Sequence, residues 1–170
     1  MELGILFSGK NEDLVGYSDS SLGTNDLNGK STTGYTVSIC GDLVSWKSKK
    51  QTHVSLSTCE AEYIAMSETC KELVSTRSLW KFLTDSDILP TLKCDCAPAI
   101  AVAMTNESRT LKHIVKLCMH YVHELYKNKN VNIEWVSTDH QLADIFTKAL
   151  ASEKFLYFRE LLLATTDPAP

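Results

Sequence analysis

The chain has 170 residues, of which 44% are hydrophobic and 22% charged, and its formal net charge is −4. This length and composition predict one globular domain with a substantial core, and the net charge gives no sign of nucleic-acid binding. No apolar run approaches the roughly 20 residues that span a bilayer, and residues 1–7 lack the features of a signal peptide, so we expect an intracellular protein with reduced cysteines.

The first part of the chain predicts a meander of three strands. Alternating apolar and polar residues mark the strands, and the turn pair Gly41-Asp42 separates the second from the third. Residues 22–30 are rich in Gly, Asn and Asp and predict a loop. The three predicted strands are residues 14–18, 35–40 and 43–46.

The clearest predicted helix follows the meander. Ser57 is the expected N-cap and Glu60 the third helical position, which together form a capping box, and the helix continues to about residue 83. A second capping box is predicted at residues 138–141, opening a helix that contains Asp144. The other predicted elements are strands at 91–94 and 131–136 and helices at 98–104, 113–127 and 153–163.

This order of elements predicts an α/β fold. Three adjacent strands and two further strands reached through helices favour a mixed five-stranded sheet flanked by helices. We expect one domain at residues 1–164 and a disordered tail at residues 165–170, which are rich in Thr, Pro and Ala.

Two aspartates follow predicted strands. Asp19 ends the first strand and Asp95 ends the fourth, and ligand sites in open α/β sheets collect beyond strand ends. Strands also commonly end in turn-forming residues, which would explain one such aspartate but explains two less well.

Glu62 is the most informative carboxylate. It begins a stripe with the spacing of one helical face, continued by Met66, Thr69, Leu73, Thr76 and Trp80. If that face packs on the sheet, Glu62 points inward, and burying an unpartnered carboxylate costs several kcal/mol. A salt bridge would explain its burial, and so would a metal or catalytic role, whereas capping alone accounts for Glu60.

Asp144 is expected one turn into its helix, where the macrodipole favours an acid. Together with Asp19, Glu62 and Asp95, however, it could form one acidic patch that would repel itself without cations. Hard oxygen ligands suit Mg²⁺ or Mn²⁺, and a pair of such ions is the usual device for phosphodiester hydrolysis.

At this point the residues resemble a known family, the ribonuclease H domains of copia-type LTR retrotransposon Pol polyproteins. The similar motifs occur in order from about residue 3 to residue 163. They are Tyr17-Ser18-Asp19, residues 30–35, residues 45–51, residues 56–63, Cys94-Asp95, residues 112–114 and residues 141–148.

The resemblance implies a ribonuclease H-like fold and an endonuclease that hydrolyses the RNA strand of RNA–DNA hybrids during reverse transcription. It implies that the catalytic and metal-binding residues are Asp19, Glu62, Asp95 and Asp144, holding two Mg²⁺ ions for which Mn²⁺ substitutes. It also implies that Lys47, Lys49 and Lys50, which charge pattern alone would place in a solvated loop, contact phosphate. The implied partners are the hybrid and the reverse transcriptase and integrase portions of a parent polyprotein, in a cytoplasmic virus-like particle or the nucleus.

The sequence departs from the family pattern around the third aspartate. Cys96-Ala97-Pro98 follow Asp95 where the family usually has Asn-Gln-Ser, Ser21 replaces a second acidic residue after Asp19, and Val115 replaces another. None of these changes removes an expected metal ligand. They leave open an alternative, a catalytically degenerate module that binds nucleic acid or protein without cutting.

A zinc protein is disfavoured. Cys94-x-Cys96 and Cys118-x-His120-x-x-His123 offer suitable atoms, but their spacings do not form a standard set of zinc ligands. His140 is expected at the surface within the second capping box. No serine or cysteine has the setting of a hydrolase nucleophile.

Overall fold

The protein is described by a computed structural model covering residues 2–5, 7–9, 11–23, 29–105 and 113–166. Its main sheet has five strands in the order β4-β3-β2-β5-β6. The strands are β2 (Leu14–Ser21), β3 (Thr32–Ile39), β4 (Asp42–Lys50), β5 (Thr91–Cys94) and β6 (Asn132–Trp135). β2, β3 and β4 pair antiparallel, whereas β2–β5 and β5–β6 are parallel. The predicted mixed five-stranded sheet is confirmed.

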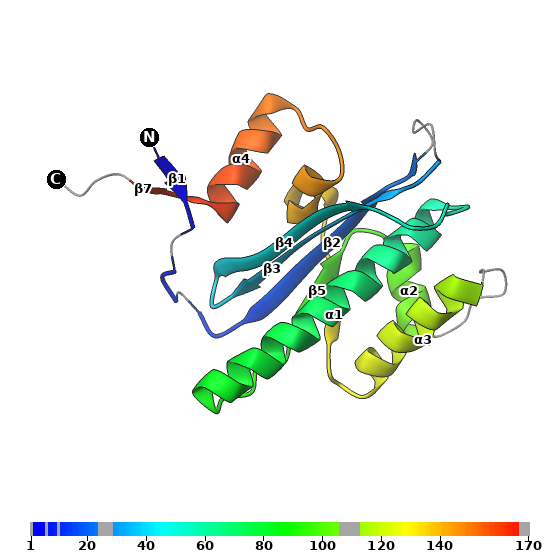
Figure 1. Ribbon diagram of the computed structural model, residues 1–170, viewed down its shortest axis with the longest axis horizontal. Helices are drawn as coiled ribbons and strands as arrows, with labels where there is room; N and C mark the ends of the chain where they lie inside the picture. The colour runs from blue at the N-terminus through cyan, green and yellow to red at the C-terminus, as the bar shows by residue number, and fades with distance from the viewer. Residues whose placement is uncertain (1, 6, 10, 24–28, 106–112, 167–170) are drawn as a thin grey trace.

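One face of the sheet is covered by α1 (Thr58–Thr84), and α2 (Ala97–Thr105) and α3 (His113–Lys127) lie on the same side (Figure 1). The predicted N-cap is confirmed, because the Glu60 backbone N–H donates to Ser57 Oγ at 3.2 Å. The second bond of the predicted capping box differs, because Glu60 Oε2 accepts from the N–H of Leu56, one residue before the N-cap, at 2.7 Å. The predicted inward stripe is buried from Glu62 through Leu73 and becomes half-buried at Thr76 and Trp80. Among the described helices, none is both long and apolar enough to span a membrane.

The other face carries η2 (Thr138–His140), η3 (Leu142–Phe146) and α4 (Ser152–Leu162), with α4 on the side of the sheet opposite α1 (Figure 1). The second predicted capping box is wrong. Ser137 and Gln141 precede two short 3-10 turns, and the Gln141 side chain accepts from the Ala143 N–H at 3.4 Å instead of reaching back. Asp144 therefore lies in a 3-10 turn and not in an α-helix.

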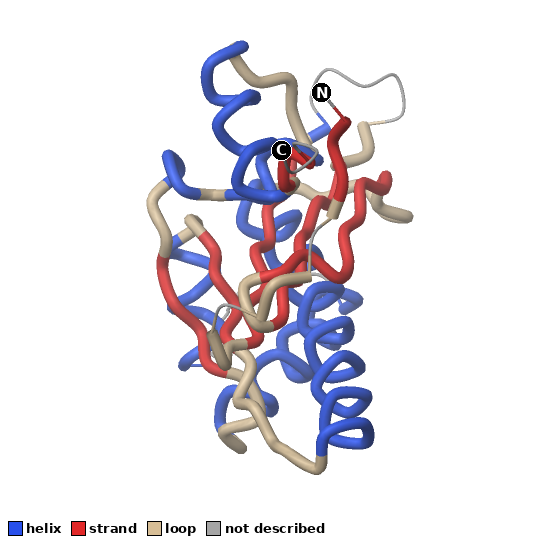
Figure 2. Tube along the Cα trace, turned by 90° about the vertical axis from the view of Figure 1, so that its left-hand side faces the viewer, coloured by secondary structure: helices blue, strands red, loops and turns tan. Residues whose placement is uncertain are grey.

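Two terminal segments form a separate two-stranded sheet. β1 (Glu2–Gly4) pairs antiparallel with β7 (Ala164–Thr166), so the two ends of the described chain lie side by side (Figure 2). The expected disordered tail is corrected at Thr165 and Thr166, whose backbones pair with β1. Residues 167–170 of that tail lie outside the described residues.

The basic cluster is also corrected. Lys47, Lys49 and Lys50 lie in the last half of β4, not in a loop, and pair with Tyr35, Thr33 and Thr32 of β3. β4 is an edge strand of the five-stranded sheet, so the lysines are on a rigid ladder at its rim.

Candidate active site

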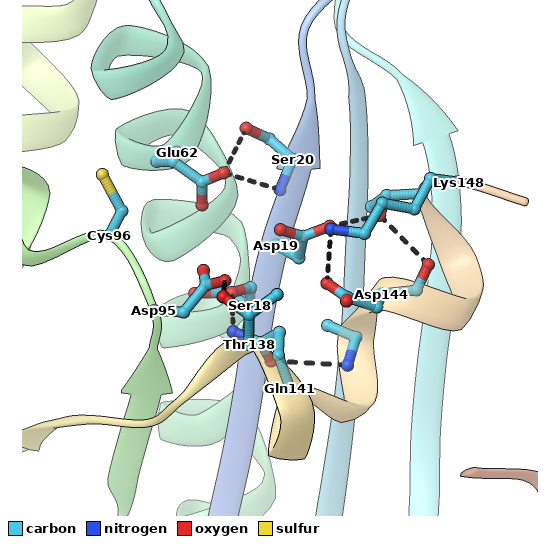
Figure 3. Close-up of polar contacts among 12 residues, drawn as sticks. Ser18, Asp19, Ser20, Glu62, Asp95, Cys96, Thr138, Gln141, Asp144 and Lys148 are labelled. Carbon is cyan, nitrogen blue, oxygen red and sulfur yellow. Dashed lines mark hydrogen bonds and ion pairs between the residues drawn. The ribbon is translucent and has the colours of Figure 1, made fainter. Parts of the chain in front are cut away.

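Four carboxylates come from four different elements. Asp19 lies near the end of β2, and Asp95 directly follows β5. Because β2 and β5 are parallel neighbours, their carboxyl ends lie at the same edge of the sheet. Glu62 reaches this edge from the first turns of α1 and Asp144 from η3 on the opposite face, and Figure 3 shows all four side chains around one space.

The distances between ligand atoms define a centre. Asp19, Asp95 and Asp144 each offer a carboxylate oxygen, and these oxygens lie within 4.8 Å of one another. Asp95 also belongs to a second group, with Glu62 and the Cys94 sulfur, that meets the same limit. The shared Asp95 joins the two groups into one acidic cluster, here called the carboxylate centre.

Gly34 allows η3 to lie close to the sheet. It pairs with Asp19 in the β2–β3 ladder, and a Cβ at this position would lie 2.5 Å from Thr147 Cγ2 and 3.0 Å from the Ala143 carbonyl oxygen. Any larger residue would therefore push η3 away. The glycine sets the approach of Asp144 and Thr147 to Asp19.

Burial and mutual repulsion make two of the carboxylates reluctant to ionise. Glu62 is 3% exposed, and burial followed by the charge of Asp19 raises its pKa to about 9. Burial also raises the pKa of Asp19 to about 6, although a hydrogen bond from Thr147 and the charge of Lys148 oppose that rise. Hydrogen bonds from Ser20 favour the ionised form of Glu62, because the Ser20 backbone N–H and Oγ both donate to Oε1, at 3.1 and 2.8 Å.

Two lysines at the centre were not predicted. Lys148 Nζ lies 2.8 Å from Asp144 Oδ1 and 3.7 Å from Asp19 Oδ2. Lys154, from α4, lies 3.0 Å from Asp144 Oδ2 and donates to the Thr138 carbonyl at 2.8 Å. The i,i+4 spacing of Asp144 and Lys148 was a usable signal, whereas nothing in the sequence linked α4 to the centre.

Three uncharged side chains hydrogen-bond the carboxylates or the backbone next to them. Thr138 Oγ1 donates to Asp95 Oδ2 at 2.8 Å, and Thr147 Oγ1 donates to Asp19 Oδ2. Gln141 is fully buried and its Nε2 donates to the Ser18 carbonyl at 2.9 Å, which ties the η2–η3 junction to β2 beside Asp19. These contacts orient the carboxylates from outside the centre.

Thiols border the centre on the side of α1. The Cys94 thiol lies 3.9 Å from Glu62 Oε2, and the Cys96 backbone N–H donates to Cys94 Sγ at 3.4 Å. The hydrogen bond between Cys59 and Cys96 lowers the pKa of Cys59 to about 7 and raises that of Cys96. The departure from the family pattern at Cys96 therefore lies beside the predicted ligands (Figure 3).

The three predicted nucleic-acid-binding lysines lie away from the carboxylate centre but on an element that contacts it. They line a pocket on β4 with Thr33, Gln51 and Thr52, and Lys47 Nζ lies 3.7 Å from Glu68. Ser48 Oγ, between them, donates to the Phe146 carbonyl of η3 at 2.6 Å. His140 is exposed, as expected, and its Nδ1 is hydrogen-bonded to Ser137 Oγ.

Comparison with known sequences gives long matches to parts of much larger proteins. The chain is 31% identical over 158 residues to the retrovirus-related Pol polyprotein from transposon TNT 1-94 of Nicotiana tabacum, covering 93% of this chain and 12% of the polyprotein. It is also 31% identical over 168 residues to the retrovirus-related Pol polyprotein from transposon RE1 of Arabidopsis thaliana, covering 96% of this chain and 11% of that polyprotein. No protein-family model matches the chain.

Comparison with solved structures gives the fold. LC11-RNase H1, isolated from compost by a metagenomic approach, matches with a TM-score of 0.60 and 13% identity, over 81% of this chain and 94% of that one. The same enzyme in complex with an RNA/DNA hybrid matches with a TM-score of 0.56 and 13% identity, over 79% of this chain and 94% of the chain in that structure. The expected ribonuclease H-like fold is confirmed.

Proposed function

Because this chain is a ribonuclease H-fold domain homologous to copia-type retrotransposon Pol polyproteins, we propose that it hydrolyses the RNA strand of RNA–DNA hybrids. The observation that carries the proposal is the carboxylate centre, where Asp19, Glu62, Asp95 and Asp144 converge from four elements. Nothing in the packing of the core requires four acids at one edge of the sheet. Hydrolysis of a phosphodiester by two metal ions, in contrast, uses carboxylates gathered at one place to hold those ions.

The donor atoms fit two divalent cations. Carboxylate oxygens are the ligands that Mg²⁺ prefers, and Mn²⁺ accepts the same set. The raised pKa values of Glu62 and Asp19 fit as well, because nearby positive charge would offset the burial and repulsion that disfavour their ionised forms. Bound there, such ions would supply an activated water and stabilise the attacking and leaving oxygens.

The residues around the carboxylates preorganise them. Ser20 fixes one oxygen of Glu62, Thr138 fixes one of Asp95, and Thr147 fixes one of Asp19. For Asp19 and Asp95 this leaves the second oxygen for another ligand, whereas Glu62 Oε2 faces the Cys94 thiol at 3.9 Å. Lys148, at the solvent side of Asp144 and Asp19, is placed to attract the anionic backbone of a substrate toward the cluster.

The substrate would be read by shape and backbone. We propose that Lys47, Lys49 and Lys50 contact phosphates along the β4 edge, which reaches η3 and therefore the carboxylate centre through Ser48. Selection of the RNA strand would come from contacts to its 2′-hydroxyls. The LC11-RNase H1 structure with an RNA/DNA hybrid supports this choice of substrate on this fold.

The chain spans 12% and 11% of the length of the two polyproteins named above. We propose that the domain acts beside the reverse transcriptase and integrase portions of a Pol polyprotein, in a cytoplasmic virus-like particle or the nucleus. The domain would there remove RNA from hybrids made by the polymerase.

A second candidate function is binding without cutting. Asp144 is already paired with both Lys148 and Lys154, and Cys96 stands next to Asp95 where the family pattern has an amide. Both features favour a degenerate module in which the cluster no longer takes metal.

The decisive experiment is cleavage of a hybrid labelled on each strand, with the purified chain in Mg²⁺, Mn²⁺ or EDTA. We expect metal-dependent cutting of the RNA strand only, abolished in Asp95→Asn. It should be retained in Asp139→Asn, a matched change at an exposed acid in η2. Equal rates in wild type and Asp95→Asn would refute the site. A folded protein that binds hybrid but never cuts it would establish the second candidate.

A further inference from the structure

A cleft lies between α4 and the face of the sheet opposite α1. A Cβ at Gly16 would meet Thr69 and Leu73 of α1, so the side chains of the neighbouring Val15 and Tyr17 point to the other side of the sheet. On that side α4 packs mainly against η3 and β7 rather than directly on the strands. The space that remains between α4 and the strands has a volume of about 270 Å³.

The walls of this cleft are mostly apolar. Val15 and Tyr17 of β2 line it from the sheet, Leu161 and Leu162 line it from α4, and Leu142 lines it from η3. Val15, Tyr17 and Leu142 are half-buried, and Leu161 is 53% exposed. A ligand that covers apolar side chains on both the sheet and the helix therefore removes additional apolar surface from water. Apolar walls with a few convergent polar groups are typical of small-molecule sites.

Positive charge enters the cleft from β5. Lys93 is the register partner of Tyr17, and its Nζ lies 5.6 Å from the centre of the Tyr17 ring. Among the described residues Lys93 forms no ion pair, and the exposed His140 lines the same cleft. The carboxylate of Asp13 is also part of the lining, but Asn11 already donates to it at 3.0 Å. The unpaired ammonium group of Lys93 therefore favours an anionic ligand.

We propose that this cleft is a binding site for a small, flat aromatic molecule that carries one anionic group. The rings lie between the sheet and α4, and the anion contacts Lys93. An apolar cavity of about 150 Å³ holds one benzene ring, so a cleft of about 270 Å³ holds about two fused rings. Asp19 and Asp95 do not line the cleft, and the proposal is independent of the proposed hydrolysis.

The test titrates the whole ¹⁵N-labelled chain with 2-naphthoate, a two-ring anion, and with its uncharged amide, 2-naphthamide. Backbone amide shifts in ¹H–¹⁵N spectra report both the Kd and the place of binding, and EDTA keeps metal away from the carboxylate centre. We expect the largest shifts on β2, β5 and α4 at residues that line the cleft. The Kd should be about tenfold lower for 2-naphthoate, because its charge adds a contact with an ammonium group.

Four variants locate the charge and the apolar wall. Lys93→Met keeps an unbranched side chain and removes the charge, so it should raise the Kd for 2-naphthoate about tenfold and leave that for 2-naphthamide unchanged. Lys127→Met, at an exposed lysine that ends α3, should change neither. Leu161→Asp should weaken binding of both molecules. Leu156→Asp, at a similarly exposed leucine of α4 that does not line the cleft, should weaken neither.

The same spectra show that each variant is folded. Amide shifts that gather away from the cleft would overturn the proposal, as would equal affinity of wild type and Lys93→Met for 2-naphthoate. AMP, titrated in the same way, distinguishes two sources of the anion. Cleft shifts with AMP would show that a nucleotide is accepted, and cleft shifts with 2-naphthoate alone would restrict the ligand to aromatic acids. The absence of cleft shifts with both would overturn the site.

Discussion

At the scale of single residues, the fold disfavours the ionised forms of Glu62 and Asp19. Burial of Glu62 beside a second carboxylate raises its pKa from 4.5 to about 9. Burial raises that of Asp19 from 3.8 to about 6, with Thr147 and Lys148 limiting the rise. Nearby positive charge would stabilise the ionised forms of both residues. Strongly shifted pKa values of this kind are more typical of functional sites than of cores.

The raised pKa values predict how stability depends on pH in the absence of metal. Between their unfolded and folded pKa values these two carboxyl groups hold more protons in the folded chain, so their contribution to the free energy of unfolding should fall as pH rises from about 4 to about 9. Above about pH 6 the falling contribution comes from Glu62, whereas the lowered pKa of Cys59 gives an opposite contribution between about pH 7 and pH 9. Urea unfolding in EDTA at several pH values measures the pH dependence, with Glu62→Gln expected to remove the falling contribution and Asp139→Asn to leave it unchanged. The same pH dependence above pH 6 in wild type and Glu62→Gln would contradict the assignment.

The four carboxylates were found from sequence because each stood at a position with a structural meaning, namely a strand end, the inner face of a helix or a helix start. Lys154 was missed because an ion pair across elements leaves no periodic signal, whereas the i,i+4 spacing of Asp144 and Lys148 was a usable signal that the sequence analysis did not use. Lys154 enters the centre from α4, whose packing against η3 depends on tertiary structure alone. Local patterns indicated the acids, and only the fold brings their cations to them.

At the scale of elements, the approach of η3 to the sheet depends on Gly34. Gly34→Ala should displace η3, because its Cβ would meet Thr147 and the Ala143 backbone. Overpacking costs about 1–3 kcal/mol, but a shift of about 1 Å at a site can lower the rate about 100-fold. We therefore expect Gly34→Ala to lower the cleavage rate about 100-fold while it lowers the free energy of unfolding by only about 1–3 kcal/mol.

Gly16→Ala is the contrasting variant. Its Cβ would meet Thr69 and Leu73 of α1, on the face of the sheet opposite η3, so it should lower stability without selectively lowering the rate. The measurement compares the cleavage rates and the urea unfolding midpoints of the two variants. A wild-type rate in Gly34→Ala would show that η3 tolerates the displacement.

The edge strand β4 carries the next prediction. Changing both Lys49 and Lys50 to Ala should weaken hybrid binding and reduce the slope of log K against log salt by about 0.9 for each lost phosphate contact. Lys81→Ala, at the opposite end of α1 from Glu62, should leave the slope unchanged. Binding of catalytically inactive Asp95→Asn protein across a salt series provides the measurement. An unchanged slope in the double variant would remove β4 from the interface.

Sequence reasoning placed these lysines in a loop because a run of like charges resembles a solvated segment. On an edge strand the same charges are favourable, since exposed lysines there discourage pairing with other chains. The second capping box failed for a related reason. Thr138 and Gln141 have the right spacing, but their side chains instead hydrogen-bond Asp95 and the Ser18 backbone, and tertiary contacts outweighed the local motif.

At the scale of the whole molecule, the order of elements predicted the mixed five-stranded sheet, but it predicted neither the strand order β4-β3-β2-β5-β6 nor the pairing of the termini. β1 and β7 are each three residues long and lie at opposite ends of the chain. Such short segments carry no periodic pattern, and their pairing becomes favourable only after the domain has brought them together. The carboxylate centre has a similar origin, because its members span residues 19 to 144 and meet only in the folded chain.

This convergence predicts how metal and charge together set the stability of the domain. Mg²⁺ that binds only the folded chain at 100 times its Kd would add about 2.7 kcal/mol per site to the free energy of unfolding. Thermal unfolding of wild type should therefore shift upward with Mg²⁺, and the shift should be nearly absent in Asp19→Asn. In EDTA the order should reverse, with Asp19→Asn unfolding at the higher temperature, because removing one charge relieves the repulsion that raises the pKa of Glu62. A variant less stable than wild type in EDTA would mean that the hydrogen bond from Thr147 and the ion pair with Lys148 outweigh that repulsion, and that the domain holds its acids together without metal.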